Sequence, residues 1–162
     1  MQNIQKILKL LKENEVEFVV IGGYAAIVHG ASCVTEDLDL CIAFEKGNLE
    51  KMLKAFSNLH PEHRLVGKTS PITETAEKLS AFKNLYFKTD LGFIDILNEV
   101  SGIGAFSEVD KHSVEVPIFD MKCKVLDLDH IIEAKKAMTR SKDKEAVLQL
   151  EVIKQKREDS SV

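Results

Sequence analysis

The sequence has little that would send the chain to a membrane or out of the cell. Its first residues, MQNIQKILKLLKENE, scatter lysines among leucines and lack the organisation of a signal peptide. No apolar run approaches the roughly 20 residues needed to cross a bilayer. The three cysteines, Cys33, Cys41 and Cys123, form no CxxC pair, which indicates reduced thiols and argues against a zinc site. We therefore expect a cytoplasmic protein with no membrane partner.

Two other absences limit the fold. No Gly-x-Gly-x-x-Gly follows the first apolar run, which argues against a Rossmann-type dinucleotide binder. The chain also has no internal repeat and no low-complexity tract. Its 162 residues are enough to bury a real core, so we expect one domain over residues 1–162, with residues 157–162 as a frayed tail.

The net charge of −4 hides an uneven distribution. Residues 133–157 hold eight Lys or Arg and four acids, a local charge of +4, which leaves −8 on the remainder. A basic segment on an acidic body suits a polyanionic ligand, although a solvated helix face explains the charge equally well.

Apolar spacing predicts a mixed β-sheet flanked by helices, an α/β (α+β) fold. The run VEFVVIGG indicates a buried strand that stops at glycine, and DLDLCIAF alternates as a second strand. AFKNLYFKTDLGFIDIL indicates a hairpin, and Pro117 favours an edge strand. Helices are expected over residues 2–14, after Gly23 up to Gly30, from Asp127 to about Ala137, and after Ser141. The irregular, polar stretch 60–79 is expected to be a loop or flap.

Two carboxylates project from one face of the second predicted strand. Asp37 and Asp39 are two residues apart, which places them roughly 6–7 Å from each other on the same side. Crowded carboxylates call for a cation, and Mg²⁺ takes oxygen ligands while leaving room for substrate phosphates. Asp95 lies between two isoleucines on another strand and offers a third carboxylate. The pattern predicts a metal-binding acidic cluster, with a polar strand edge as the alternative.

Gly22 and Gly23 stand where the first strand meets the next helix. Missing side chains there let a phosphate approach the backbone, and helix N–H groups attract an anion. Thr35 could add a hydroxyl contact. Together, the glycines and aspartates suit phosphoryl or nucleotidyl transfer. A plain strand-to-helix turn is the alternative.

These residues resemble the nucleotidyltransferase superfamily related to DNA polymerase β. Its signature is a Gly-Gly or Gly-Ser turn, a short helix, Asp-x-Asp on the next strand and a later third acid, matched here by Gly22-Gly23, Asp37-Leu38-Asp39 and Asp95. The pattern GG-x-A…HG…T-x-DLDL and the later IIEAKKAMTRSKD are most similar to the minimal branch that includes AbiEii-type toxins. The resemblance spans about residues 15–153 and implies a nucleotidyltransferase fold.

The resemblance also implies roles for individual residues. Asp37, Asp39 and Asp95 would be the catalytic carboxylates that bind Mg²⁺ (or Mn²⁺), and Asp95 would also activate the attacking hydroxyl. Nucleotide phosphates would meet the glycines, Thr35 and a basic group; Asp143 would cap or orient the last helix. The basic group consists of Lys135, Arg140 and Lys142. Relatives commonly carry Arg-x-Arg-x-Thr where this chain has ASCVT, so Ala31 and Cys33 replace two cationic contacts.

The sequence therefore predicts a magnesium-dependent transferase that moves a nucleoside monophosphate from an NTP to a hydroxyl or phosphate acceptor. RNA, a protein or a small molecule such as an antibiotic could be the acceptor, and the toxin branch would add tRNA and an antitoxin partner. A catalytically silent nucleotide- or partner-binding module on the same scaffold is the alternative. An Asp-x-Asp phosphatase fits less well, because Cys41 stands where that motif carries Thr or Val.

Several nearby residues have a structural explanation beside the functional one. His29 is expected to pack beside Gly30 rather than to act in catalysis. Cys33 and Cys41 are expected to be small buried groups rather than ligands. Tyr24 is expected to pack, although its place after the glycines would also let it border a nucleotide pocket.

Overall fold

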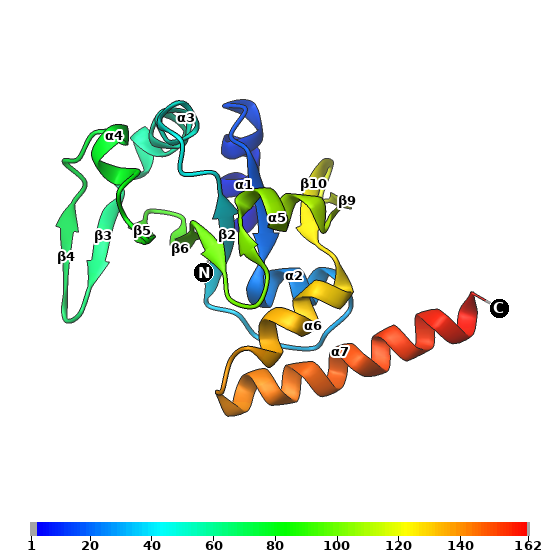
Figure 1. The fold of residues 1–162 in the computed structure, drawn as a ribbon. Helices are drawn as coiled ribbons and strands as arrows, with labels where there is room; N and C mark the ends of the chain where they lie inside the picture. Colours follow the sequence, from blue (N-terminus) through cyan, green and yellow to red (C-terminus); the bar gives the residue numbers. More distant parts are fainter. Residues whose placement is uncertain (1–2, 162) are drawn as a thin grey trace.

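The computed structural model describes residues 3–161, and within them eight strands form one mixed sheet (Figure 1). The strand order across the sheet is β4-β3-β5-β6-β2-β1-β10-β9, and a separate two-stranded ribbon pairs β7 with β8. The strands of the large sheet are β1 (Phe18–Ile21), β2 (Asp37–Ile42), β3 (Glu62–Leu65), β4 (Lys68–Pro71), β5 (Asn84–Thr89), β6 (Gly92–Leu97), β9 (Ser113–Ile118) and β10 (Met121–Leu126). The ribbon consists of β7 (Glu99–Val100) and β8 (Gly104–Ala105). The predicted mixed sheet flanked by helices is confirmed.

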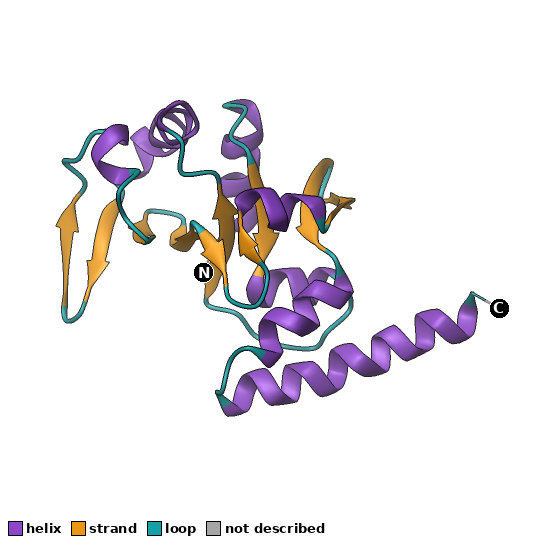
Figure 2. Cartoon of the chain, viewed as in Figure 1, coloured by secondary structure: helices purple, strands orange, loops and turns teal. Residues whose placement is uncertain are grey.

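Two groups of helices flank the sheet (Figure 2). In one group α1 packs against α3 and α3 against α4; in the other α2 packs on β1 and β2, α6 packs on α2, and α7 packs on α6. The helices are α1 (Ile4–Glu13), α2 (Gly22–Val28), α3 (Lys46–Phe56), α4 (Ala76–Leu79), α5 (Phe106–Lys111), α6 (Leu128–Lys136) and α7 (Ser141–Ser160), with a 3₁₀ turn at Ser57–Leu59. None of the described helices combines the length and apolar character that crossing a bilayer requires.

The central strands form because their apolar side chains fill the core. All four residues of β1 are buried, and on β2 the leucines at 38 and 40 are fully buried while the aspartates at 37 and 39 are partly exposed. β2 runs antiparallel to β1 and parallel to β6. The sheet therefore places β2, which carries two carboxylates, directly beside β6, which carries the third.

Several local predictions are confirmed. The hairpin of β5 and β6 turns at Asp90 and Leu91, and Pro117 lies on the edge strand β9. A backbone N–H missing from an outer strand costs no sheet hydrogen bond. Asp127 caps α6, because its side chain accepts a hydrogen bond from the backbone N–H of His130.

Four expectations were wrong. Stretch 60–79 is not a loop: it contains the β3–β4 hairpin and α4. Helix α2 begins at Gly22 rather than after Gly23. Ser141 does not cap α7; Arg140 occupies the capping position without a side-chain hydrogen bond. The predicted tail at 157–162 is helical through Ser160, where α7 runs out from the body at one side of Figure 1, and residue 162 lies outside the described residues.

Candidate active site

Three carboxylates from two neighbouring strands come together at one place in the sheet. Asp37 and Asp39 lie on β2, and Asp95 lies on β6. The parallel register pairs Asp39 directly with Asp95, across strands that lie about 4.8 Å apart. The structure thus brings together the three acids that the sequence analysis selected.

Burial and mutual repulsion disfavour the charged form of these groups. Burial, together with the neighbouring Asp95 and Asp37 carboxylates, raises the pKa of Asp39 to about 7. A hydrogen bond from the backbone of Gly23, together with the charge of Lys135, partly opposes this rise. Burial also raises the pKa of Asp95. The uncharged forms of Asp39 and Asp95 are therefore favoured over a wider pH range than in a free carboxyl group.

Arg64 is the main counter-charge of this cluster, and the sequence analysis missed it. Its Nη2 lies 2.5 Å from Asp95 Oδ1 and 3.6 Å from Asp37 Oδ2. The guanidinium also lies over the ring of Phe93, 4.8 Å from its centre, with Tyr86 at 5.9 Å. This arrangement places an arginine from the β3–β4 hairpin inside the acidic cluster, and it keeps the pKa of Asp95 from rising further.

One hydrogen-bond donor of Arg64 lacks an acceptor. Its Nη1 is buried and has no hydrogen-bond partner among the described residues. A buried donor without an acceptor costs about 1–3 kcal/mol. An anionic oxygen arriving at the cluster would satisfy it.

The glycine turn lies against Asp39. Gly22 has a φ of +66°, and a Cβ built there would lie 2.8 Å from Asp39 Cβ and Cγ. A Cβ on Gly23 would lie 3.1 Å from Thr35, whose hydroxyl donates to the backbone oxygen of Asp37 at 2.8 Å. The two glycines therefore let the start of α2 approach the carboxylates, and Thr35 positions the beginning of β2.

The three basic residues predicted to contact phosphates have different surroundings in the structure. Asp143 is almost fully buried; Arg140 Nε donates to it at 2.7 Å and Lys135 Nζ at 3.4 Å. The favourable partners lower the pKa of Asp143, although its burial opposes them. Lys135 also acts on Asp39 through its charge, whereas Lys142 is exposed. Lys135 thus lies within electrostatic reach of the carboxylates, and Arg140 serves the junction of α6 and α7.

The remaining polar residues have identifiable surroundings. His29 is buried, with Nε2 2.9 Å from the backbone oxygen of Leu126, and Arg157 Nη2 donates to its backbone oxygen at 3.2 Å. Cys41 is buried, and burial raises its pKa to about 12, which leaves an inert thiol. Cys33 is exposed rather than buried, contrary to expectation, with Sγ 3.7 Å from the backbone oxygen of Gly23.

The chemistry of the donor set suits a hard divalent cation, although among the described residues these three carboxylates are not gathered within 4.8 Å of one another. Asp37, Asp39 and Asp95 offer only oxygen atoms, the ligands that Mg²⁺ and Mn²⁺ take in proteins. The raised pKa of Asp39 and the recruitment of Arg64 both indicate a site where positive charge is stabilised.

Comparison with solved structures fits this geometry. Lincosamide antibiotic adenylyltransferase LnuA, bound to lincomycin, superposes with a TM-score of 0.64 at 13% identity over 94% of this chain and 98% of that one. The fold is that of nucleotidyltransferases. The antibiotic-resistance factor ANT(2'')-Ia gives a TM-score of 0.59 at 13% identity, covering 98% of this chain and 90% of that one. TM1012 of Thermotoga maritima, described as a candidate nucleotidyltransferase, gives 0.53 at 16% identity, covering 98% and 88%.

No protein-family model and no curated protein matches the sequence. The likeness is therefore one of fold.

Proposed function

We propose that this chain transfers a nucleoside monophosphate from an NTP to a hydroxyl group. The observation that carries the proposal is the meeting of Asp37, Asp39 and Asp95 beside the glycine turn, in a fold shared with nucleotidyltransferases. In this reaction the acceptor oxygen forms a bond to the α-phosphorus, the bond to the β-phosphate oxygen breaks, and pyrophosphate leaves.

The three carboxylates would hold Mg²⁺ or Mn²⁺, which supplies neutralisation of charge on the triphosphate. Asp95 accepts the proton of the attacking hydroxyl; its raised pKa makes it a stronger base than a free carboxylate. Arg64 Nη1 donates to a phosphate oxygen and so gains the partner it lacks. Gly22 and Gly23 keep side chains away from the phosphates, and Lys135 adds positive charge.

We propose a small-molecule hydroxyl as the acceptor. LnuA and ANT(2'')-Ia are named for their action on antibiotics, and the chain covers nearly the whole length of both. A tRNA acceptor and an antitoxin partner rest on the toxin-like sequence pattern alone, and the experiment below treats tRNA as a competing outcome.

The test is transfer of label from each of the four α-labelled NTPs, with Mg²⁺ and with Mn²⁺, to a lincosamide, an aminoglycoside or tRNA. We expect an adduct and pyrophosphate from the wild type and from Asp120→Asn, an exposed control on the β9–β10 turn. Asp37→Asn/Asp39→Asn should form neither product. If the wild type bound no nucleotide and transferred no label at millimolar concentrations, the proposal would fail.

One observation favours the silent binding module. Arg64 already neutralises Asp95 and part of the charge of Asp37, as a structural ion pair would. That alternative predicts stabilisation by NTP and metal without any transfer, so the same assay separates the two.

A further inference from the structure

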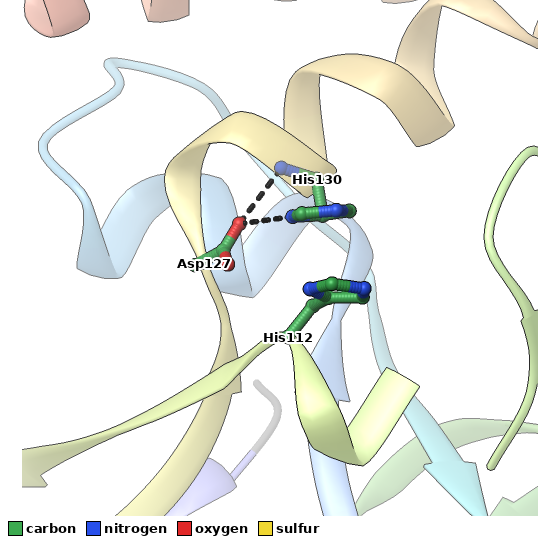
Figure 3. A group of neighbouring side chains, drawn as sticks. All are labelled: His112, Asp127 and His130. Atoms are coloured by element: carbon green, nitrogen blue, oxygen red, sulfur yellow. Dashed lines mark hydrogen bonds and ion pairs between the residues drawn. The ribbon is translucent and has the colours of Figure 1, made fainter. Parts of the chain in front are cut away.

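A second cluster of potential ligands lies at the start of α6. His112 follows α5, Asp127 lies between β10 and α6, and His130 is in the first turn of α6 (Figure 3). One ligand atom from each residue lies within 4.8 Å of the others. All three side chains are partly buried, so they are held by their surroundings and still reached by solvent.

The backbone fixes two of these residues relative to each other. The N–H of Asp127 donates to the backbone oxygen of His112 at 2.8 Å, which ties the end of α5 to the start of α6. Asp127 Oδ1 caps the helix by accepting from the backbone N–H of His130 at 2.8 Å and lies 2.7 Å from its Nδ1. The capping role explains the contact between Asp127 and His130, but it gives the His112 ring no hydrogen-bond partner.

The ring of His112 stacks on that of His130, with centres 3.7 Å apart and planes 14° from parallel (Figure 3). Among residues 3–161, neither ring nitrogen of His112 has a hydrogen-bond partner. An unpaired imidazole beside a His–Asp pair supplies the third member of a His₂Asp set, and Zn²⁺ and neighbouring transition ions favour imidazole with one carboxylate.

We propose that His112, Asp127 and His130 form a binding site for a transition-metal ion of the Zn²⁺ class. Bonds of about 2.0–2.1 Å to a tetrahedral ion would place the ligand atoms about 3.4 Å apart. The nitrogen lone pairs of two stacked imidazole rings lie in parallel planes and cannot both point at one ion. One of the two rings therefore turns when the ion binds. That ring is His112, because His130 is held by Asp127 while His112 is not. The ion replaces the proton shared by His130 and Asp127, and that proton passes to solvent.

One of the three residues, His130, borders open space. His130 also lines an open groove of about 430 Å³ between α6 and α7, bordered by Glu133, Lys136 and Glu151. A three-residue site with one open position is the arrangement that keeps a solvent molecule on zinc. The lack of a CxxC pair argues only against a zinc site with cysteine ligands. The His112, Asp127 and His130 set contains no sulfur, so that argument does not apply to it.

The site is separate from the carboxylate cluster, since none of its three residues belongs to that cluster. It would nevertheless hold the beginning of the helix that carries Lys135, whose charge acts on Asp39. A metal ion at this position would tie together the end of α5, the end of β10 and the start of α6.

The test is titration of the whole, chelator-treated protein with Co²⁺, followed by visible absorption, in excess Mg²⁺. Mg²⁺ saturates oxygen-only sites and does not replace imidazole ligands. We expect an intense band of low-coordinate Co²⁺ that saturates at one equivalent and disappears when Zn²⁺ is added. His112→Ala should weaken Co²⁺ binding at least about tenfold, and Asp127→Asn should do the same while keeping the helix cap, because asparagine caps as well as aspartate.

Two control variants make the result specific. His60→Ala removes an exposed histidine that is paired with Asp90, and it should leave the Co²⁺ band unchanged. Asp37→Asn/Asp39→Asn should also keep the band, which separates this proposal from the proposed transferase activity. Circular dichroism of each metal-free variant checks folding. The absence of a band in the wild type, or equal Co²⁺ affinity in His112→Ala and the wild type, would overturn the proposal.

Discussion

If the acidic cluster binds a divalent cation as proposed, Arg64 competes with that cation for the same carboxylates. Its guanidinium contacts Asp95 and Asp37, so replacing it with glutamine removes one positive charge from the cluster. We expect Arg64→Gln to bind Mn²⁺ about tenfold more tightly, a gain of ~1.4 kcal/mol. The metal-free protein should lose about 1.5–3 kcal/mol of stability, because hydrogen bonds to charged groups are worth that much.

Calorimetry with Mn²⁺ and urea unfolding in a chelator measure the two effects. Lys88→Gln is the matched control, because Lys88 is an exposed cation on the neighbouring strand β5. Equal Mn²⁺ affinity in Arg64→Gln and the wild type would show that the arginine does not occupy the cation position.

Asp39 gives the metal-free protein a characteristic pH dependence. Its pKa is about 7 in the folded chain against an ordinary 3.8, so the folded state holds the proton over a range where the unfolded state has lost it. Because the folded state then binds more protons, the free energy of unfolding falls as pH rises through that range. A single group contributes at most about 1.4 kcal/mol per pH unit.

Urea unfolding from about pH 4 to pH 7 in a chelator tests this sign. We expect Asp39→Asn, which cannot ionise, to flatten the fall, whereas Asp120→Asn should follow the wild type. If the free energy of unfolding changed with pH in the same way in the wild type and in Asp39→Asn, Asp39 would not have the raised pKa that its burial implies.

At the scale of the elements, the first turn of α2 depends on a glycine. Gly22 combines a positive φ with a position against Asp39, and an added Cβ would clash with that side chain. We expect Gly22→Ala to destabilise the protein by more than the ~1–2 kcal/mol cost of the left-handed backbone alone. In α3, Gly47 has open space around it, so Gly47→Ala should stabilise by about 0.4–1 kcal/mol. Chemical denaturation of both variants checks the contrast, and a neutral Gly22→Ala would refute it.

The success of sequence reasoning also varied by element. Strands with buried apolar faces, such as β2 with Leu38 and Leu40, were predicted because burial imposes alternation. The β3–β4 hairpin was missed because most of its side chains are exposed and two prolines interrupt the pattern. It is held by antiparallel pairing and by His63, which stacks on Phe82. Missing this hairpin meant missing Arg64, since no local pattern indicates that residue 64 reaches residue 95.

Over the whole molecule, the candidate active site draws on residues from Gly22 to Lys135, so ligand binding should stabilise the entire chain. At a hundredfold excess over the dissociation constant, a ligand adds about 2.7 kcal/mol. For 162 residues this raises the unfolding temperature by about 5–10 °C. We expect NTP with Mg²⁺ to produce this shift, and either one alone to produce less. Thermal melts measure it, and an equal shift in Asp37→Asn/Asp39→Asn would place the nucleotide elsewhere.

Strand periodicity and a glycine turn constrain where Asp37, Asp39 and Asp95 can lie, so the acidic cluster could be predicted from the sequence. The group of His112, Asp127 and His130 could not. Residues 112 and 127 approach each other only because β9 returns antiparallel beside β10, which brings the end of α5 to the start of α6. The number of residues between 112 and 127 does not by itself indicate that the β9–β10 hairpin brings them into contact.

The tip of the β3–β4 hairpin is a suitable place to attach a fluorescent label. Val66 is fully exposed and Gly67 has open space around it, two and three residues beyond Arg64 on the same hairpin. A fluorescent dye attached at the tip would therefore lie outside the acidic cluster, on the same hairpin as Arg64, which contacts the carboxylates. The fluorescence of such a labelled protein would show whether the hairpin moves when a cation or nucleotide is added, without any chemical turnover.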